Sequence, residues 1–236
     1  MRTAVIAITI NKGGQGKTTT VKTLATAAVT AGYTVVILDV DSQQNSVGWR
    51  KRRDNNHKDN PLPLPLARFC GEQNLLEEIE HAKKAGCELI LIDTPPGKSP
   101  EAMAAVDAAE FVIIPFWNDQ DSYDGVKTTT LMVRRIGKKA VGLLNFVPPH
   151  SKSHEETARD VLKPIGLPMA PVVLSRYDAH RLANPKGLTA QEMEPGGPAA
   201  QEIQRLWDWF SAHVLHGTDA EVQDGTFAHV QTGTDG

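Results

Sequence analysis

The stretch that decides the fold of this chain is Asn11-Lys12-Gly13-Gly14-Gln15-Gly16-Lys17-Thr18-Thr19. An apolar, strand-like run at 4–10 precedes it, and a helix-like segment at 18–31 follows it. A strand, a glycine-rich turn and a helix in this order are the context in which the pattern G-x-x-x-x-G-K-[ST] forms a phosphate-binding loop. The match departs from that pattern at its first glycine, where Asn11 stands, and it adds Lys12 beside it.

The residue types in this loop suit a ligand with dense negative charge. Gly13, Gly14 and Gly16, with Gln15 between them, let the backbone turn with positive φ, so that N–H groups converge on an anion. The N-terminus of the following helix adds free N–H groups and a favourable dipole. We therefore expect a nucleotide site in which Lys17 reaches the β- and γ-phosphates, the Thr18 hydroxyl ligates Mg²⁺ and Thr19 contacts the α-phosphate.

Size and composition limit the class of protein. The chain has 236 residues, of which 40% are hydrophobic, enough for one substantial α/β domain. Its net charge is -3, so contact with nucleic acid would need a local basic patch. The two cysteines, Cys70 and Cys87, lack the C-x-x-C spacing of a zinc site or redox pair. Without a membrane-length apolar run or a signal-peptide layout, we expect a cytoplasmic protein.

Short apolar runs alternate with helical patterns along the chain. We expect strands at 4–10, 34–40, 64–69, 88–93, 111–115, 140–146 and 171–174. We expect helices at 18–31, 43–53, 74–84, 100–108, 123–136, 155–162 and 201–213. This alternation predicts an α/β fold with a doubly wound, mostly parallel sheet and helices on both faces. We expect a single domain at 1–216 and, from the Gly, Thr, Asp and Gln that follow, a disordered tail at 217–236.

Two of the expected strands lead into carboxylates. Asp39 and Asp41 end the strand at 34–40, and strand alternation would place them on one face. Asp93 ends the strand at 88–93, immediately before Thr94-Pro95-Pro96-Gly97. Ligands of such sheets collect at the carboxyl ends of the strands, and buried carboxylates are costly without a cation or donor nearby. An apolar strand that ends in Asp, combined with the loop, predicts a carboxylate that contacts Mg²⁺ directly or through water.

Three segments together resemble the ParA/MinD family of P-loop ATPases: K-G-G-x-G-K-T-T at 12–19, D-x-D at 39–41 and D-T-P-P-G at 93–97. The resemblance covers residues 4–210 and departs from the family at Ser42, where proline is usual. It implies that Lys12 crosses a dimer interface to the partner's phosphates, that Asp39 helps to hold the water shell of Mg²⁺, and that Asp41 orients the attacking water. Family members often use an Asn at the position of Asn145 to bind adenine. From the residues alone, Lys12 also fits a contact within its own subunit or a solvated side chain, and Asn145 also fits a turn cap.

The resemblance also implies partners. Short ParA proteins, which lack an N-terminal helix-turn-helix, form a homodimer on ATP and bind DNA without sequence preference. Hydrolysis, stimulated by a ParB-like centromere-binding or adaptor protein, then releases the DNA. We accordingly predict a Mg²⁺-dependent ATP hydrolase that associates with the nucleoid, not the membrane, and segregates plasmid or chromosomal DNA. Candidate DNA contacts are Arg176, Arg181 and Lys186, or the basic cluster at 50–53, and both groups also fit solvated helix ends.

Three other functions fit the same loop. A positioning ATPase of the same family would move another cargo, such as a protein organelle or a chemoreceptor cluster. A ligase related to dethiobiotin synthetase would use ATP on a small acceptor. A MinD-like membrane switch would use an amphipathic C-terminal helix, but the polar face beside the apolar stripe of Ile203, Leu206, Trp207, Phe210 and Val214 is poor in Lys and Arg. We therefore expect that stripe to pack on the core.

Overall fold

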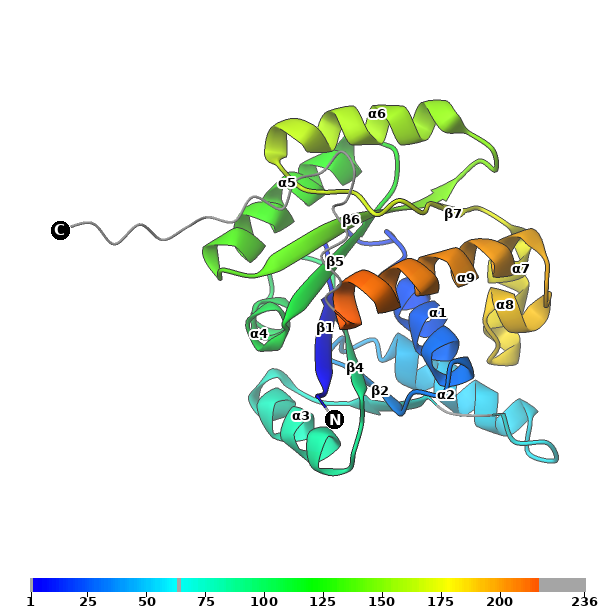
Figure 1. Cartoon of the computed structure of the whole chain (residues 1–236). Helices are drawn as coiled ribbons and strands as arrows, with labels where there is room; N and C mark the ends of the chain where they lie inside the picture. The colour runs from blue at the N-terminus through cyan, green and yellow to red at the C-terminus, as the bar shows by residue number, and fades with distance from the viewer. Residues whose placement is uncertain (1, 63–64, 217–236) are drawn as a thin grey trace.

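The computed structural model describes residues 2–62 and 65–216 (Figure 1). The tail expected at 217–236 lies outside these residues. The described part contains a 7-stranded sheet with the order β3-β2-β4-β1-β5-β6-β7, in which every neighbouring pair is parallel. The strands are β1 (Ala4–Ile8), β2 (Val35–Asp39), β3 (Leu66–Phe69), β4 (Leu89–Asp93), β5 (Phe111–Phe116), β6 (Lys139–Val147) and β7 (Leu174–Ser175). The helices are α1 (Lys17–Thr30), α2 (Asn45–Asn56), α3 (Leu75–Lys84), α4 (Pro100–Ala108), α5 (Gln120–Arg135), α6 (Lys152–Leu162), α7 (Asp178–Ala183), α8 (Ala190–Met193) and α9 (Pro198–Phe210).

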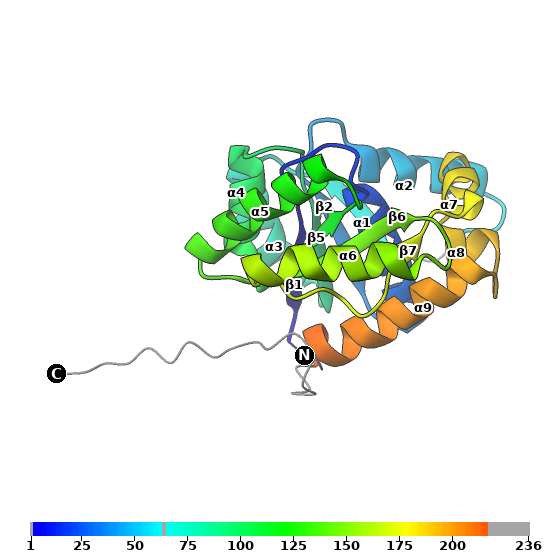
Figure 2. The same ribbon diagram turned by 90° about the horizontal axis from the view of Figure 1, so that it is seen from above.

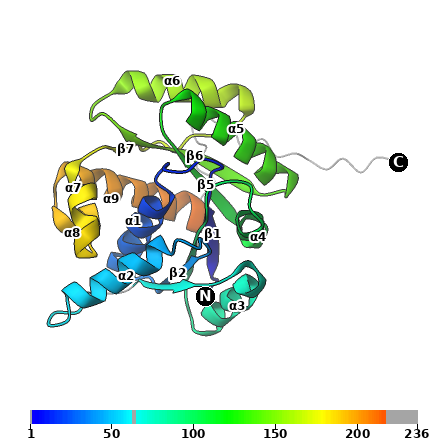
Figure 3. The same cartoon turned by 180° about the vertical axis from the view of Figure 1, so that it is seen from behind.

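Helices cover both faces of the sheet (Figures 2 and 3). The helices α1, α2, α7, α8 and α9 pack on one face, and α3 to α6 pack on the other. Successive strand residues alternate between the two layers: Ile6 and Ile8 of β1 belong to the core under α1 and α9, whereas Val5 and Ala7 belong to the opposite core. Both layers are apolar, as a parallel sheet buried on two faces requires. The predicted doubly wound α/β fold is confirmed.

Strand register brings the expected site residues to one edge of the sheet. In the parallel pairing, Asp93 lies opposite Ile8 of β1 on one side and opposite Asp39 of β2 on the other. The loop that follows β1 therefore starts beside both carboxylates. Residues 11–19, 39 and 93, far apart in the chain, meet at the carboxyl ends of three adjacent strands.

Local capping explains where two helices begin. Ser99 accepts a hydrogen bond from Ala102 N at 3.2 Å, and Pro100 occupies the first helical position of α4. Asp119 accepts from Ser122 N at 2.8 Å, so α5 begins at Gln120, earlier than the expected residue 123. The apolar period located both helices, but the cap of α5 lies before its first apolar residue.

The last third of the chain differs most from expectation. The strand expected at 171–174 is only Leu174–Ser175, and the short helices α7 and α8 were not predicted. With 6 and 4 residues, these helices are too short to show a clear apolar period. The capping box formed by Thr189 and Glu192 is the signal that would have located α8. Helix α9 begins at Pro198, not at residue 201, because proline suits the first helical position.

The apolar stripe of α9 packs on the core as predicted. Ile203 and Leu206 are 1% exposed and Phe210 is 0% exposed, all in the layer that contains α1. Among residues 2–62 and 65–216, no helix combines the length and the apolar character needed to cross a bilayer.

Candidate nucleotide and magnesium site

The glycine-rich segment forms a loop between β1 and α1. Gly14 and Gly16 have φ of 77° and 85°, the left-handed region that favours glycine. No side chain caps the start of α1 at Gly16. The first N–H groups of the helix therefore have no side-chain acceptor. A Cβ at Gly16 would lie 2.8 Å from Asn145 Nδ2 and 2.9 Å from the ring of Phe146. Glycine is therefore required there by backbone conformation and by space, and the loop has the geometry of an anion nest.

Two side chains of the loop turn inward. Gln15 is 3% exposed, and its Oε1 accepts from Trp117 N at 2.9 Å and from Ser122 Oγ at 2.8 Å. This side chain ties the loop to the end of β5 and to α5, so only its backbone is free to meet a phosphate. Lys17 is 7% exposed and donates to Lys12 O at 3.4 Å. Burial lowers the pKa of Lys17, while the carboxylates of Asp93 and Asp41 oppose that change.

Lys12 is paired with acidic residues of its own chain. Its Nζ lies 2.8 Å from Asp121 Oδ2 and 3.5 Å from Asp119 Oδ1, at the start of α5. The hydrogen bond with Asp121 raises the pKa of Lys12, which therefore carries its charge at neutral pH. Within one subunit the cation is held beside the loop and is not directed into its centre.

Asp39 and Asp93 form a buried pair that α2 completes. Both are in register on neighbouring strands and are 0% and 1% exposed. Asp39 accepts from Ser46 N at 2.9 Å and Val47 N at 3.2 Å through Oδ2, and from Asp41 N at 3.2 Å through Oδ1. Ser46 Oγ donates to Asp93 Oδ2 at 2.7 Å. Sequence reasoning missed Ser46, although a hydroxyl near a helix start that follows an acidic strand end is the signal for such a role.

Asp41 does not share a strand face with Asp39 as expected. Strand β2 ends at Asp39, and Asp41 lies in the turn that leads to α2. Its Oδ1 accepts from Gln43 N at 2.9 Å, and the residue is 8% exposed. The alternation argument was therefore wrong in its geometry, because the chain leaves the sheet before Asp41. The hydrogen bond from Asp41 N to Asp39 still keeps the two carboxylates in one local structure.

Without a further cation, burial and nearby negative charge disfavour the ionised forms of Asp39 and Asp93. Burial, and then the charge of Asp39, raise the pKa of Asp93 to about 7, against opposing effects of Ser46, Thr18 and Lys22. Burial also raises the pKa of Asp39. Lys22 of α1 is 9% exposed, and burial lowers its pKa to about 8 although Asp93 and Asp39 attract it. Two carboxylates and one desolvated ammonium group thus influence one another's pKa values.

The donors here fit a magnesium ion. Asp93 Oδ1 is buried and has no hydrogen-bond partner within the described residues, and the Thr18 hydroxyl interacts with the same carboxyl group. The described part of the chain contains no cluster of 3 or more His, Cys, Asp or Glu side chains suited to a metal. Mg²⁺ does not need such a cluster, because it takes one or two carboxylate or hydroxyl ligands and completes its shell with water and phosphate.

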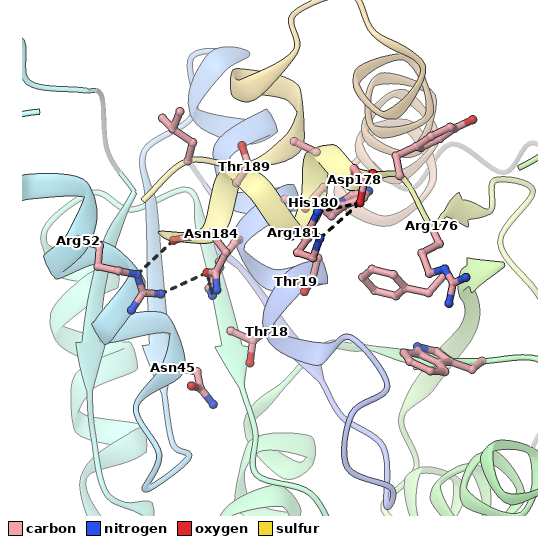
Figure 4. Close-up of a pocket in the computed structure, with 17 residues that line it drawn as sticks. Thr18, Thr19, Asn45, Arg52, Arg176, Asp178, His180, Arg181, Asn184 and Thr189 are labelled. Atoms are coloured by element: carbon pink, nitrogen blue, oxygen red, sulfur yellow. Dashed lines mark hydrogen bonds and ion pairs between the residues drawn. The ribbon is translucent and has the colours of Figure 1, made fainter. Parts of the chain in front are cut away.

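A cavity of about 1050 Å³ opens beside the loop (Figure 4). Thr18 and Thr19 of α1, Asn45 and Arg52 of α2, and the segment 176–190 contribute to its wall. Its volume is in the upper range of small-molecule sites. The cavity therefore adjoins the start of α1 and, at Asn45, the start of α2.

Comparison with known proteins decides the family. The model of the CobQ/CobB/MinD/ParA nucleotide binding domain matches residues 6–206. The chain belongs to this family.

The chain is 31% identical over 214 residues to maintenance of carboxysome distribution protein A of Gloeobacter kilaueensis, covering 86% of this chain and 95% of that protein. It is also 31% identical over 145 residues to the chromosome-partitioning ATPase Soj of Thermus thermophilus, covering 51% and 57%. Its fold matches the septum site-determining protein MinD of Pyrococcus horikoshii complexed with Mg-ADP, with a TM-score of 0.72, 21% identity, and coverage of 93% of this chain and 100% of that chain.

In this CobQ/CobB/MinD/ParA-family chain, Asn145 lies beneath the loop and not in the cavity. It is 0% exposed, and its Nδ2 donates to Gln15 O at 3.3 Å and to Thr20 Oγ1 at 3.2 Å. Its side chain supports the loop from the protein interior. Its Oδ1 is buried and has no hydrogen-bond partner within the described residues, so the adenine contact implied by the resemblance stays a prediction.

The basic cluster at 50–53 is not an open cationic surface. Arg53 is 1% exposed and forms an ion pair with Glu192 at 2.6 Å, and Arg50 pairs with Asp54 at 2.5 Å. Two of its members, Arg52 and Arg53, help to hold the turn after α7 together with Trp49, Asn56 and His57. Five consecutive carbonyls of this turn each accept a hydrogen bond from one of these five side chains. The carbonyls of 184, 185, 186, 187 and 188 accept, in that order, from Arg52 Nε, Asn56 Nδ2, His57 Nε2, Arg53 Nη1 and Trp49 Nε1. We refer to these contacts as the α2 clamp.

The other candidate DNA residues occupy two different places. Arg176 and Arg181 line the cavity, and Arg181 lies 3.3 Å from Asp178 (Figure 4). Lys186 is exposed on the turn that the α2 clamp holds. All three residues are exposed, and Arg176 and Arg181 share the cavity wall, so the structure does not separate Arg176 from the other candidates.

Proposed function

We propose that this chain is a Mg²⁺-dependent ATPase that dimerises on ATP and uses DNA as the surface on which it positions a cargo. The observation that supports this most is the unpaired, buried Oδ1 of Asp93 next to Thr18, directly beside a glycine loop with the geometry of an anion nest. Of the buried carboxylate oxygens in the described residues, this is the one without a protein donor. A hydrated divalent cation would satisfy it.

The residues take the following roles in this proposal. The loop residues 12–19 bind the triphosphate, with Lys17 at the β- and γ-phosphates, and Thr18 and Asp93 hold Mg²⁺. Bound Mg²⁺ neutralises phosphate charge as the terminal phosphoryl group leaves. Asp39, whose oxygens already accept three backbone N–H groups, acts on the metal's water shell. Asp41, in the turn beside it, orients the attacking water.

Lys12 would complete the site of a second subunit. Its present partners are exposed, with side chains of Asp121 and Asp119 that are 82% and 44% accessible. An exposed ion pair of this kind is weak because solvent screens it, so exchanging it for a phosphate costs little. A cation from each subunit would offset the repulsion between two bound triphosphates that face one another.

The cargo has two candidates. Partition of plasmid or chromosomal DNA with a ParB-like partner is the first, supported by the similarity to the chromosome-partitioning ATPase Soj. Positioning of a protein organelle through an adaptor is the second, supported by the similarity to a carboxysome distribution protein over 95% of that protein's length. Both require the same nucleotide-controlled DNA binding, through Arg176, Arg181 and Lys186.

DNA binding across a salt series, with ATP, ADP or no nucleotide, tests this function. We expect binding with ATP alone and a linear decrease of log affinity with log salt, because phosphate contacts release counterions. Lys186→Glu should weaken binding and lower the salt slope by about 1 or more. The matched control is Lys84→Glu, another exposed lysine, on α3 in the opposite helix layer.

Three results would contradict this proposed function or support another one. DNA binding that ignores the nucleotide would contradict the switch. ATP-dependent binding to liposomes without DNA binding would support the MinD-like alternative. ATP turnover that requires a small carboxylate or amine acceptor, and that neither DNA nor a partner protein changes, would support the ligase.

A further inference from the structure

A second hollow, of about 230 Å³, lies where the start of α6, the segment before β7 and the middle of α9 meet. Figure 1 shows β7 between α6 and α9, and β7 is the last strand at its edge of the sheet. The hollow is smaller than the roughly 300–1,000 Å³ of small-molecule sites, so it suits a few side chains of a peptide better than a whole cofactor. We refer to it as the β7 groove.

Two cationic side chains of the β7 groove have no partner. Lys152 at the start of α6 and Arg205 in α9 line the groove and are exposed. Neither side chain forms an ion pair or a hydrogen bond with residues 2–62 or 65–216. Their donors are therefore available to an anionic group that enters the groove.

The carboxylates of the groove already have partners within the chain. Glu202 is 9% exposed, and its Oε2 and Oε1 accept from Ser175 N and Ser175 Oγ, both at 2.7 Å. Glu155 forms an ion pair with Arg159 at 2.9 Å. An incoming group would therefore find unused donors at Lys152 and Arg205, whereas the nearby acceptors are occupied.

An apolar wall lies beside these cations. Pro171, Val172 and Val173, the residues that lead into β7, line the groove, and both valines are half-buried. A wall of this kind gains from contact with an apolar side chain. The groove thus fits a segment in which acidic residues stand next to an apolar one.

The chain itself contains such a segment after α9. Residues 219–224 read D-A-E-V-Q-D, and the whole stretch 217–236 has four acidic residues and neither Lys nor Arg. Its charge is therefore opposite to that of the unpaired groove side chains. Val222 stands directly beside Glu221, which is the combination that the groove requires.

The distance along α9 permits this contact. The described chain ends at His216, whose Nε2 lies 2.8 Å from Tyr33 Oη. At a rise of about 1.5 Å per residue, His216 is roughly 16 Å along the helix from Arg205. An extended chain covers about 3.3 Å per residue, so Glu221 and Asp224 reach roughly 17 and 26 Å beyond His216. Residues 219–224 can therefore turn back along α9 and meet Arg205.

We propose that residues 219–224 dock in the β7 groove of their own chain. Their carboxylates pair with Lys152 and Arg205, and Val222 packs against Val172. Each exposed ion pair is weak, but the segment is tethered to α9, and a short tether gives an effective concentration in the millimolar range. Weak contacts therefore suffice, and salt should loosen them because it screens exposed charges.

A zero-length carbodiimide tests this docking in the full chain without nucleotide, so the result does not depend on the proposed ATPase function. The reagent joins a lysine amine to a carboxylate that lies against it. At low salt, peptide mass spectrometry should find Lys152 joined to a carboxylate of 219–224. The link should be lost in Asp219→Asn/Glu221→Gln/Asp224→Asn, which changes no described residue. The matched control is Asp235→Asn, an acidic residue outside the docking segment, which should keep the link.

Arg205→Gln tests the second cation. The yield of the Lys152 link should fall by about two- to fivefold, the effect of removing one exposed ion pair. Arg135→Gln, a change at an exposed arginine of α5, is the matched control and should leave the yield unchanged. Circular dichroism establishes that each variant is folded. An unchanged yield in folded Arg205→Gln would overturn the assignment of Arg205.

Two other occupants of the groove would be recognised in the same experiments. In a mixture of ¹⁴N- and ¹⁵N-labelled chains, a link that joins the two labels would assign the groove to a second copy and overturn docking within one chain. A wild-type chain without any link from Lys152 to 219–224 would also overturn the proposal. If Lys152→Gln/Arg205→Gln then weakened DNA binding, the groove would be a phosphate-binding surface.

Amide chemical shifts provide a second measurement that needs no reagent. In the ¹⁵N-labelled full chain, the amide peaks of 219–224 should shift between wild type and Lys152→Gln/Arg205→Gln, and the peak of Asp235 should not. Added salt should move the wild-type peaks toward the positions of the variant. Peaks of 219–224 that coincide in both proteins at low salt would contradict the docking.

Discussion

Lys12 Nζ lies 2.8 Å from Asp121 Oδ2 in the same subunit. The lysine that the proposed dimer needs is therefore already paired, but with an exposed partner whose side chain is 82% accessible. A contact this exposed is weak and exchangeable, so it positions Lys12 at the surface beside the loop without trapping it. ATP would only have to compete with a surface ion pair.

Removing this ion pair should favour the dimer slightly. In Asp121→Asn the cation is freer to reach a partner's phosphates, so the ATP concentration for half-maximal dimerisation should fall, by about fivefold at most because exposed ion pairs are weak. Light scattering during an ATP titration measures this. Asp124→Asn is the matched control, since Asp124 accepts from Gln120 and not from Lys12. A higher ATP requirement in Asp121→Asn would mean that the pair assists the dimer.

Ser46 should control affinity for magnesium. Its hydroxyl donates to Asp93 Oδ2, which leaves Oδ1 available for the metal. In Ser46→Ala this orientation is lost, and partners of metal ligands typically change metal affinity by about 10–100-fold. The Mg²⁺ concentration for half-maximal ATPase activity should rise accordingly, with little change at saturating Mg²⁺. Ser42→Ala, in the turn before α2, is the control, and an unchanged Mg²⁺ requirement in Ser46→Ala would count against this role.

The α2 clamp should dominate the stability of the 184–192 segment. Arg53 and Glu192 form a buried ion pair, and removing one partner of such a pair costs about 3–5 kcal/mol because the other is left unpaired. Urea unfolding of Arg53→Met should show this loss. Arg53→Met/Glu192→Met should recover part of it, because the carbonyl of Gly187 still lacks its donor Arg53 and the cap at Thr189 is lost. Equal losses in the single and double variants would show that the pair itself is not what stabilises the segment.

Lys22 should make the free energy of unfolding depend on pH between its pKa values in the folded and unfolded chain. Its pKa is about 8 in the folded chain and 10.5 in the ordinary case, so between these values the unfolded chain binds more protons. The free energy of unfolding should therefore increase as pH rises from 8 to 10.5, by about 3 kcal/mol at most from this group. Lys22→Met removes the titrating group, and the difference in stability between wild type and Lys22→Met should change over this range. A pH-independent difference would contradict the lowered pKa.

The sequence predicted the fold well because its signals are local and repeated. The glycine loop at 11–19 and the strand that ends at Asp93 each carry a residue pattern that the backbone geometry requires. The layer arrangement then follows from the alternation of apolar runs with helical periods. The stripe of Ile203, Leu206 and Phe210 was correctly expected to pack on the core, since its polar face lacks the cations of a membrane helix.

Contacts between distant segments could not be predicted in the same way. In the sequence, Arg53 belongs to a basic run typical of an exposed surface. Only the folded chain brings Glu192, which is 139 positions away, into contact with Arg53. Asn145 has the residue type of a base contact, but its depth beneath Gln15 depends on how the loop packs over β6. Ser46 became a partner of Asp93 through the register of β2 and β4 and the start of α2. These roles depend on tertiary geometry that no spacing along the chain encodes.

In the proposed function, ATP joins two subunits through Lys12. Asp41→Ala, which should bind ATP and hydrolyse it poorly, provides the background in which an ATP dimer accumulates. Light scattering with ATP and Mg²⁺ should show a dimer for Asp41→Ala and a folded monomer for Lys12→Ala/Asp41→Ala. An ATP-dependent dimer of the same stability in both proteins would contradict the account.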